Sequence, residues 1–212
     1  MTRLILARHG NTFAPEDKPV WVGARTDLPL VDKGVAQARA IGEALRQAGL
    51  VPSVLSCGPL RRTRETAAII MAITGFDAAA LRIDDRLREI DYGAWEGKST
   101  DEIIATGGDA ELAGWNKNGI FPPSPGWSPD EAQLRANAAA ILGEATRLSG
   151  AQTAMAISSN GILRFFAAQA VNAAAFPDRK VATGHVCVME HGDDGWHIRQ
   201  WNAPPAVLAH IT

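Results

Sequence analysis

Arg8, His9 and Gly10 follow a short apolar run, and their side chains could act on a phosphate or a carboxylate. Arginine offers a fixed fork of donors that suits these anions, and a neutral histidine can attack phosphorus or carbon or move a proton. The pair alone also fits a surface arginine beside a hydrogen-bonded histidine, because a short motif is a hypothesis until its structural context is known. Its meaning therefore depends on the other polar segments of the chain.

Three later segments carry polar side chains at points where the pattern predicts that a strand ends and a helix begins. Residues 58–67 combine arginines with a helix N-terminus, whose free backbone N–H groups also attract anions. Residues 87–97 supply acids on a glycine-rich stretch, and residues 158–161 form a small polar turn. Because the strands of such a sheet share one carboxyl edge, we expect these segments and His9 to meet there.

The hydrophobic pattern alternates between short apolar runs and amphipathic stretches. Runs typical of buried strands lie at residues 4–7, 51–56 and 153–158. Helices are predicted from Asp32 to about Ala48, from Pro59 to about Ile73 and from Ile162 to Val171. Residues 186–189 and 196–201 predict a hairpin that turns at Asp193-Asp194-Gly195. This order predicts an α/β fold: a three-layer αβα sandwich whose central sheet is mostly parallel, with helices on both faces.

Two S-x-x-E patterns predict further helix starts. Ser99 with Glu102, and Ser128 with Glu131, each have the spacing of a capping box. Asp32 is likewise expected to cap the first helix.

Residues 107–127 contain repeated glycine and proline together with two tryptophans and a phenylalanine. This composition fits a lid over a site as well as a surface loop whose aromatic side chains pack on the body. We expect one domain over residues 1–212, with a lid-like insertion at about residues 99–128.

The composition excludes several classes of protein. The chain has 212 residues, 46% of them hydrophobic, and its formal net charge of -2 argues against a general nucleic-acid or anionic-membrane binder. No signal peptide or membrane span is evident in the sequence, so we expect a cytoplasmic protein. Cys57 and Cys187 have apolar or small neighbours and are expected to be reduced core thiols.

Taken in order, these segments resemble the histidine phosphatase superfamily, also called phosphoglycerate mutase-like. The likeness rests on four motifs: RHGNT at residues 8–12, DLPL at 27–30 with Gly34 and Gln37-Ala38, PLRRTRETA at 59–67, and LREIDYGAWEG at 87–97. It resumes at the late strand, helix and hairpin. Four motifs in this order are far more specific than one.

The resemblance implies roles for four residues. His9 would be the nucleophile that takes a phosphoryl group, and Arg8 and Arg62 would hold the phosphoryl oxygens. Glu89 would donate a proton to the leaving oxygen, which requires a raised pKa.

Neighbouring charges offer alternatives to these assignments. Arg61 falls on a free position of the arginine motif, and Arg64 is expected to be a helix-surface charge. Without the resemblance, Glu89 could equally be an ion-pair partner of Arg86 or Arg88.

The chain departs from the family where a second histidine is expected after the late strand. An ungapped register places Ser159 at that position, and the alternative register places Asn160 there. A neutral donor would then replace an imidazole, and losing one such donor typically lowers the rate about a hundredfold. His185 is the one other histidine that could replace it, although it also fits a half-buried strand residue bonded to backbone.

The resemblance implies a metal-independent phosphomonoesterase that acts on a small phosphorylated metabolite. No metal or cofactor is expected, because arginines and helix-terminal amides would balance the charge on the transferring group. Two alternatives stay open: a cofactor-dependent phosphoglycerate mutase, and a weakly active or inactive protein that binds phosphorylated ligands. We expect substrate specificity in residues 14–26 and in the insertion; the sequence leaves open whether the chain forms a homo-oligomer.

Overall fold

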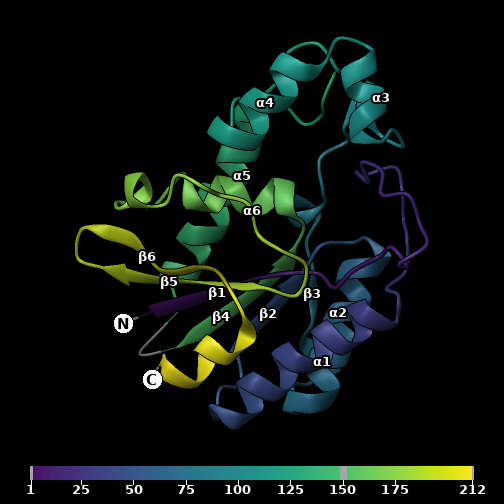
Figure 1. Ribbon diagram of the computed structural model, residues 1–212. Helices are drawn as coiled ribbons and strands as arrows, with labels where there is room; N and C mark the ends of the chain where they lie inside the picture. Colours follow the sequence, from purple (N-terminus) through teal and green to yellow (C-terminus); the bar gives the residue numbers. More distant parts are fainter. Residues whose placement is uncertain (1, 149–151, 212) are drawn as a thin grey trace.

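A computed structural model describes residues 2–148 and 152–211, which contain a six-stranded sheet (Figure 1). The strands are β1 (Thr2–Arg8), β2 (Val54–Cys57), β3 (Arg82–Ile83), β4 (Thr153–Ser158), β5 (Val186–Gly192) and β6 (Gly195–Ala203). Their order is β3-β2-β4-β1-β5-β6; the first four are parallel, whereas β5 runs antiparallel to β1 and β6 antiparallel to β5. The predicted α/β class with a mostly parallel sheet is confirmed.

Strand β1 lies inside the sheet because both of its faces are apolar. Successive side chains of a strand point to opposite faces. Leu4 and Leu6 accordingly join one core cluster, and Ile5 and Ala7 join the other. A strand buried on both faces fixes the position of the loop that follows it.

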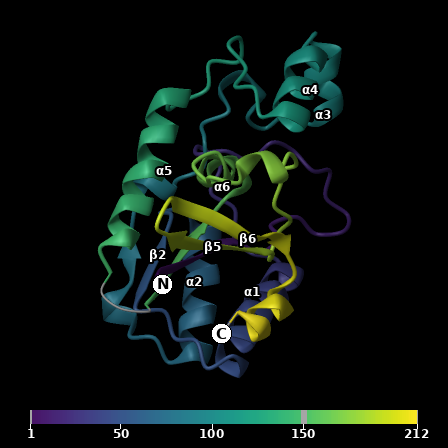
Figure 2. The same cartoon turned by 90° about the vertical axis from the view of Figure 1, so that its left-hand side faces the viewer.

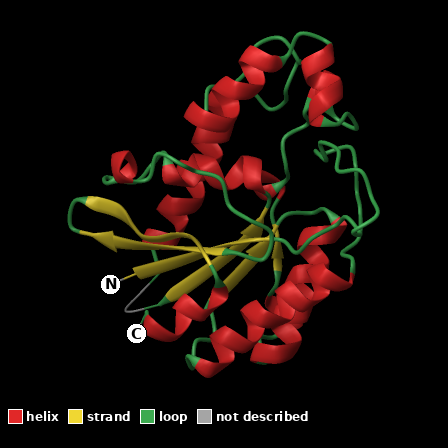
Figure 3. Cartoon of the chain, viewed as in Figure 1, coloured by secondary structure: helices red, strands yellow, loops and turns green. Residues whose placement is uncertain are grey.

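Helices cover both faces of the sheet, as predicted (Figures 1 and 2). Helices α1 (Asp32–Gln47) and α2 (Arg61–Thr74) lie on one face, and α5 (Glu131–Thr146) and α6 (Asn160–Ala167) lie on the other. The short 3-10 helix η5 (Pro205–His210) packs beside α1. Figure 3 shows the three layers by secondary structure.

Four connections meet at one edge of the sheet. The register pairs Arg8 with Ser158 across β1 and β4, so these two strands end side by side. Next to β4, β2 ends at Cys57, whose register partner is Ile157. On the other side of β1, the antiparallel β5 begins, and the Arg8 N–H donates to the His185 carbonyl at 3.0 Å. This edge therefore collects the segments that carry the predicted chemistry.

Of the three predicted helix caps, one is confirmed and two are wrong. Ser99 and Glu102 form the predicted capping box at the start of α3 (Thr100–Ala105). The box at Ser128 is wrong: Ser128 exchanges two backbone hydrogen bonds with Asp91, and Asp130 caps α5 instead. The cap at Asp32 is also wrong, since this residue is already the first of α1 and the preceding Val31 provides no side-chain cap.

The insertion contains a second helix that its composition did not predict. Helix α4 (Asp109–Asn118) follows α3, and the two lie together at the top of Figure 1. Trp115 and Trp127 are buried, with ring centroids 5.0 Å apart in an edge-to-face arrangement. Trp127 also packs edge-on against Tyr92, with centroids 4.8 Å apart. The aromatic side chains of the insertion thus belong to the core, and the function of a lid stays a prediction.

Cys57 and Cys187 are both buried and free, as predicted. Burial raises the pKa of the Cys57 thiol to about 11 and that of the Cys187 thiol to about 12, so both stay protonated. Within residues 2–148 and 152–211, no helix has the length and apolar character needed to cross a membrane.

Candidate active site

His9 begins the loop after β1 and is buried. Its Nδ1 lies 2.7 Å from the carbonyl oxygen of Gly10. Because a carbonyl only accepts, Nδ1 carries the hydrogen, and Nε2 keeps a free lone pair. Burial lowers the pKa of His9 well below its usual value, and the nearby Arg8 and Arg62 lower it further. His9 is therefore held as a neutral imidazole in a positively charged pocket.

Arg8 ends β1 and is oriented by one backbone contact. Its Nη1 donates to the Val181 carbonyl at 2.6 Å. Its Nε is buried, and no acceptor for it lies among the residues that the structure describes. A buried donor without a partner is costly, and an oxyanion in the cavity would supply the missing acceptor.

Arg62 lies in the first turn of α2 and is 1% exposed. Its Nη1 donates to the Thr26 carbonyl at 2.8 Å, and its Nη2 donates to the Gly23 carbonyl at 3.2 Å. Arg61 and Arg64, on the same turn, are exposed. The three arginines of this motif thus differ in burial, and Arg62 is the one that lines the cavity.

Glu89 is 5% exposed and accepts two backbone hydrogen bonds. Oε1 accepts from the Ile90 N–H at 3.0 Å, and Oε2 accepts from the Gly161 N–H at 3.2 Å. Burial raises the pKa of Glu89, although Arg62 and the two amides oppose the shift. Gly161 leaves no room for a side chain, because a Cβ there would collide with the Glu89 carboxyl group and the Tyr92 hydroxyl.

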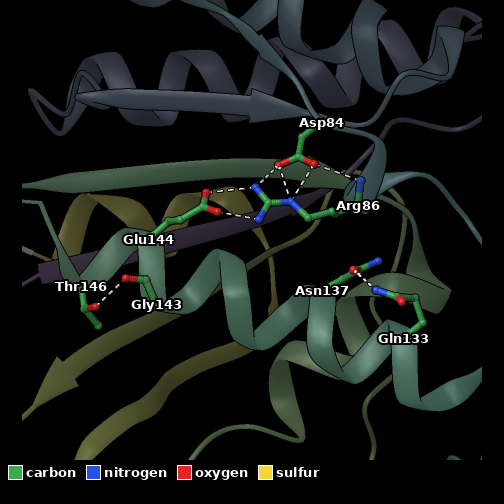
Figure 4. Close-up of polar contacts among 7 residues, drawn as sticks. All are labelled: Asp84, Arg86, Gln133, Asn137, Gly143, Glu144 and Thr146. Atoms are coloured by element: carbon green, nitrogen blue, oxygen red, sulfur yellow. Dashed lines mark hydrogen bonds and ion pairs between the residues drawn. The ribbon is translucent and has the colours of Figure 1, made fainter.

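The alternative that Glu89 pairs with Arg86 or Arg88 is wrong. Arg86 lies between two other carboxylates, with Nη2 2.6 Å from Asp84 and Nη1 2.5 Å from Glu144 (Figure 4). Arg88 pairs with Asp85 at 2.8 Å. The Arg86 contacts attach the segment before Glu89 to α5, and Glu89 is left to face the cavity.

Of the three residues predicted to complete the phosphate site, Asn160 lines the cavity, whereas Ser159 and His185 do not. Asn160 lines the cavity, and its Oδ1 accepts from the Val181 N–H at 2.8 Å, so its NH2 group is the part available to a ligand. Ser159 is buried; its Oγ has no partner within the described ranges, and it is not one of the residues that line the cavity. His185 Nδ1 donates to the Asn202 carbonyl at 2.9 Å, and this residue also lies outside the lining.

The cavity has a volume of about 770 Å³. Arg8, His9, Arg62 and Glu89 line it together, and Tyr92 and Asn160 lie among them. The outer wall comes from residues 11–22 of the long β1–α1 loop and from Trp115 and Asn116 of α4. Both regions expected to carry specificity therefore contribute to the lining.

Arg164 attaches the α4 part of this wall to α6. Its Nη1 donates to the Trp115 carbonyl at 2.6 Å, and its guanidinium lies 4.5 Å from the centre of the Trp115 ring. Arg164 is buried, so this cation–π contact is shielded from water.

Sequence reasoning missed several residues of the lining, among them Tyr92 and two lysines. Tyr92 stands in the motif at residues 87–97, and its hydroxyl lies with the Glu89 carboxyl group beside Gly161. Lys33 and Lys180 also line the cavity, and nothing in their local sequence indicates it.

Comparisons with known proteins identify the family of this chain. A family model described as the histidine phosphatase superfamily (branch 1) matches residues 4–204. A 2,3-bisphosphoglycerate-dependent phosphoglycerate mutase of Clavibacter sepedonicus is 34% identical over 128 residues, which are 60% of this chain and 50% of the relative. One from Methylobacterium radiotolerans is 27% identical over 183 residues, 85% of each chain. The chain spans about half the length of the first of these relatives.

Solved structures resemble the whole chain. A mycobacterial glucosyl-3-phosphoglycerate phosphatase in complex with inorganic phosphate has a TM-score of 0.78 and 25% identity, covering 98% of this chain and 100% of its own. An alpha-ribazole-5'-P phosphatase-like structure from Escherichia coli has a TM-score of 0.73 at 21% identity, and the match covers 96% of this chain and 98% of that structure. At that identity the second likeness shows the fold alone.

Proposed function

The chain belongs to the histidine phosphatase superfamily (branch 1), and from this premise we propose that it is a metal-independent phosphomonoesterase that forms a phosphohistidine. One observation carries the proposal: a neutral His9, two arginines and a Glu89 of raised pKa line a single cavity. A nucleophile, an anion cradle and a proton donor are the three parts that phosphoryl transfer to a side chain requires.

In the first step, His9 Nε2 attacks phosphorus and a P–N bond forms while the P–O bond of the ester breaks. The reacting atoms must lie in line, which the fixed orientation of the imidazole by Gly10 favours. Glu89, whose raised pKa favours the protonated form, gives its proton to the departing alkoxide. The alcohol then leaves the cavity.

In the second step, water attacks the phosphohistidine, and Glu89, now a carboxylate, accepts the proton of that water. The P–N bond breaks, inorganic phosphate is released, and both His9 and Glu89 return to their starting protonation states. One carboxyl group thus serves as acid and then as base, which a raised pKa favours.

Arg8 and Arg62 would balance the charge on the transferring group. Both guanidinium groups are oriented by backbone carbonyls before any ligand arrives, and this pre-organisation favours transition-state stabilisation. We further propose that Asn160 supplies the remaining neutral donor, with Ser159 in the position of the family's second histidine. Asn160 is favoured because it lines the cavity and its oxygen is already engaged by Val181.

The test is hydrolysis of para-nitrophenyl phosphate in the presence of EDTA. We expect steady turnover by the wild-type chain, and a loss of about 10⁴-fold or more in His9→Ala because the nucleophile is removed. His210→Ala is the matched control, because His210 is exposed and does not line the cavity. This variant should keep the wild-type rate. Equal rates for wild type and His9→Ala would refute the proposal.

The curated relatives favour a second candidate, a phosphoglycerate mutase, although the first of them matches over only half its length. Isomerisation of 3-phosphoglycerate with a bisphosphate primer would support that candidate over the phosphatase. A third outcome, phosphate bound without any phosphohistidine at His9, would indicate a binding protein of little or no activity. Mass spectrometry of the acid-labile phosphoprotein separates this outcome from the other two.

A further inference from the structure

Positive charge is concentrated in the cavity, although the chain as a whole carries a net charge of -2. The lining has four cationic side chains, from Arg8, Lys33, Arg62 and Lys180, and two acidic ones, from Asp17 and Glu89. The excess of cations is therefore a local property of the site.

The two acids do not neutralise the lysines. Asp17 Oδ2 accepts from the Ala14 N–H at 2.7 Å, which closes a turn of its own loop. Glu89 accepts from two backbone amides, and its raised pKa favours the uncharged form. In the described part of the chain, neither acid forms an ion pair with a lysine or an arginine.

The arginines and the lysines of the lining differ in exposure and in the elements that carry them. The arginines flank His9, where the phosphoryl group of the substrate must lie, and two guanidinium charges match a phosphomonoester of charge about -2. Lys33 comes from the first turn of α1, and Lys180 comes from the connection between α6 and β5. Both lysines are exposed, and no ion pair engages either of them among the residues described. The two arginines already balance the charge of the phosphoryl group, so the lysines are available to bind another anion.

We propose that the alcohol part of the substrate carries a second anionic group, a carboxylate or a phosphate, which Lys33 and Lys180 bind at the mouth of the cavity. The inference rests on the proposed phosphatase function and specifies its substrate class. A lysine ammonium is a compact charge on a flexible stem, which can follow either anion. The two lysines come from separate elements and line the same cavity, while the arginines would hold the phosphoryl end.

The experiment uses matched pairs of esters that differ in the second anion. 3-Phosphoglycerate against glycerol 3-phosphate tests a carboxylate, and fructose 1,6-bisphosphate against fructose 6-phosphate tests a phosphate. For at least one pair, we expect kcat/KM of the wild-type chain to favour the ester with the second anion about tenfold or more. The preference should fall to about one in the Lys33→Met/Lys180→Met double variant and should weaken with added salt.

Lys117→Met is the matched control, because Lys117 is an exposed lysine of α4 that does not line the cavity. This variant should keep the wild-type preference. Equal kcat/KM values within both pairs, or a preference that survives in the double variant, would overturn the inference while leaving the phosphatase proposal intact.

Binding measurements keep the inference testable if no ester is hydrolysed. Calorimetric titration of the His9→Ala chain with the same four esters measures affinity without turnover. A tighter Kd for the acidic member of a pair, lost when both lysines are replaced in the same background, supports the subsite. Equal affinities for all four esters contradict it.

Discussion

At the inner end of the cavity, His9, Arg62 and Glu89 are at most 5% exposed, and each is bonded to a backbone group. At its mouth, Lys33 and Lys180 are exposed. The inner side chains lie at or near the ends of buried elements, whereas the outer wall is built mainly from the long β1–α1 loop and α4. The first arrangement favours fixed geometry, and the second allows the lining to change without disturbing the sheet.

This difference indicates that the inner end acts on the phosphoryl group and that the mouth binds the rest of the substrate. Inner substitutions should change kcat, because they remove groups that act on the transferring phosphoryl group. Substitutions at the mouth should change KM, because they remove contacts made equally in the ground state and the transition state.

The largest difference in kcat between substitutions at the inner end and at the mouth of the cavity is expected at Arg62. Arg62→Met should lower kcat about 10³-fold or more, because it removes a pre-organised cation from the charge that develops on phosphorus. Arg64→Met, two residues along the same helix, removes an exposed guanidinium and should have almost no effect. Steady-state kinetics with para-nitrophenyl phosphate measure both. A similar loss in the two variants would show that general positive charge, rather than position, matters.

Arg62 is buried, so its loss could also unfold the chain. Thermal unfolding followed by circular dichroism provides the control, and Arg62→Lys keeps the charge while losing the planar fork. A folded Arg62→Lys chain that retains full kcat would contradict the role of bidentate contacts.

The next effect is a change in the pH profile at Glu89. Its pKa is raised, so the proton donor is present up to a higher pH and is lost as pH rises through that pKa. We expect kcat/KM for an alkyl phosphate to fall on the alkaline side, and Glu89→Gln to lower the rate about 10²-fold and abolish that fall. The loss should be smaller for para-nitrophenyl phosphate, whose leaving group needs less protonation.

The titration of His9 is a further test of the inner end. Its pKa lies well below 6.5, so the neutral nucleophile persists as pH falls through that value. NMR titration of the His9 imidazole in the free chain measures this pKa without interference from ionisation of a substrate. A His9 resonance that titrates near pH 6.5 would contradict the lowered pKa.

Among the residues near the inner end of the cavity, Asn160 and Ser159 are expected to have the smallest effects on kcat. Asn160→Ala removes the NH2 donor, together with the acceptor for the Val181 N–H, and it should lower kcat about tenfold. Ser159→Ala should lower it less than roughly threefold, since its hydroxyl lies outside the lining. A larger loss of kcat in Ser159→Ala than in the Asn160 variant would assign the donor to Ser159.

The sequence predicted the fold and the inner end well. The buried strands at residues 4–7 and 153–158 were visible because their apolar runs are local signals, and Cys57 and Cys187 were expected in the core where they lie. Helix α4 was missed because its residues stand among glycines and prolines, and its stability comes from tertiary contacts of Trp115. The cap at Ser128 failed because pairing with Asp91, distant in sequence, engages its backbone.

By itself, the sequence determined the family, the sheet and the motif residues that flank His9, because these depend on local pattern and on the shared edge of a parallel sheet. Only the tertiary structure showed that Arg86 is paired with Asp84 and Glu144, so that Glu89 is free to face the cavity. It also decided that Lys33 and Lys180 share the mouth. Packing of distant loops sets such neighbours, and no local pattern encodes it.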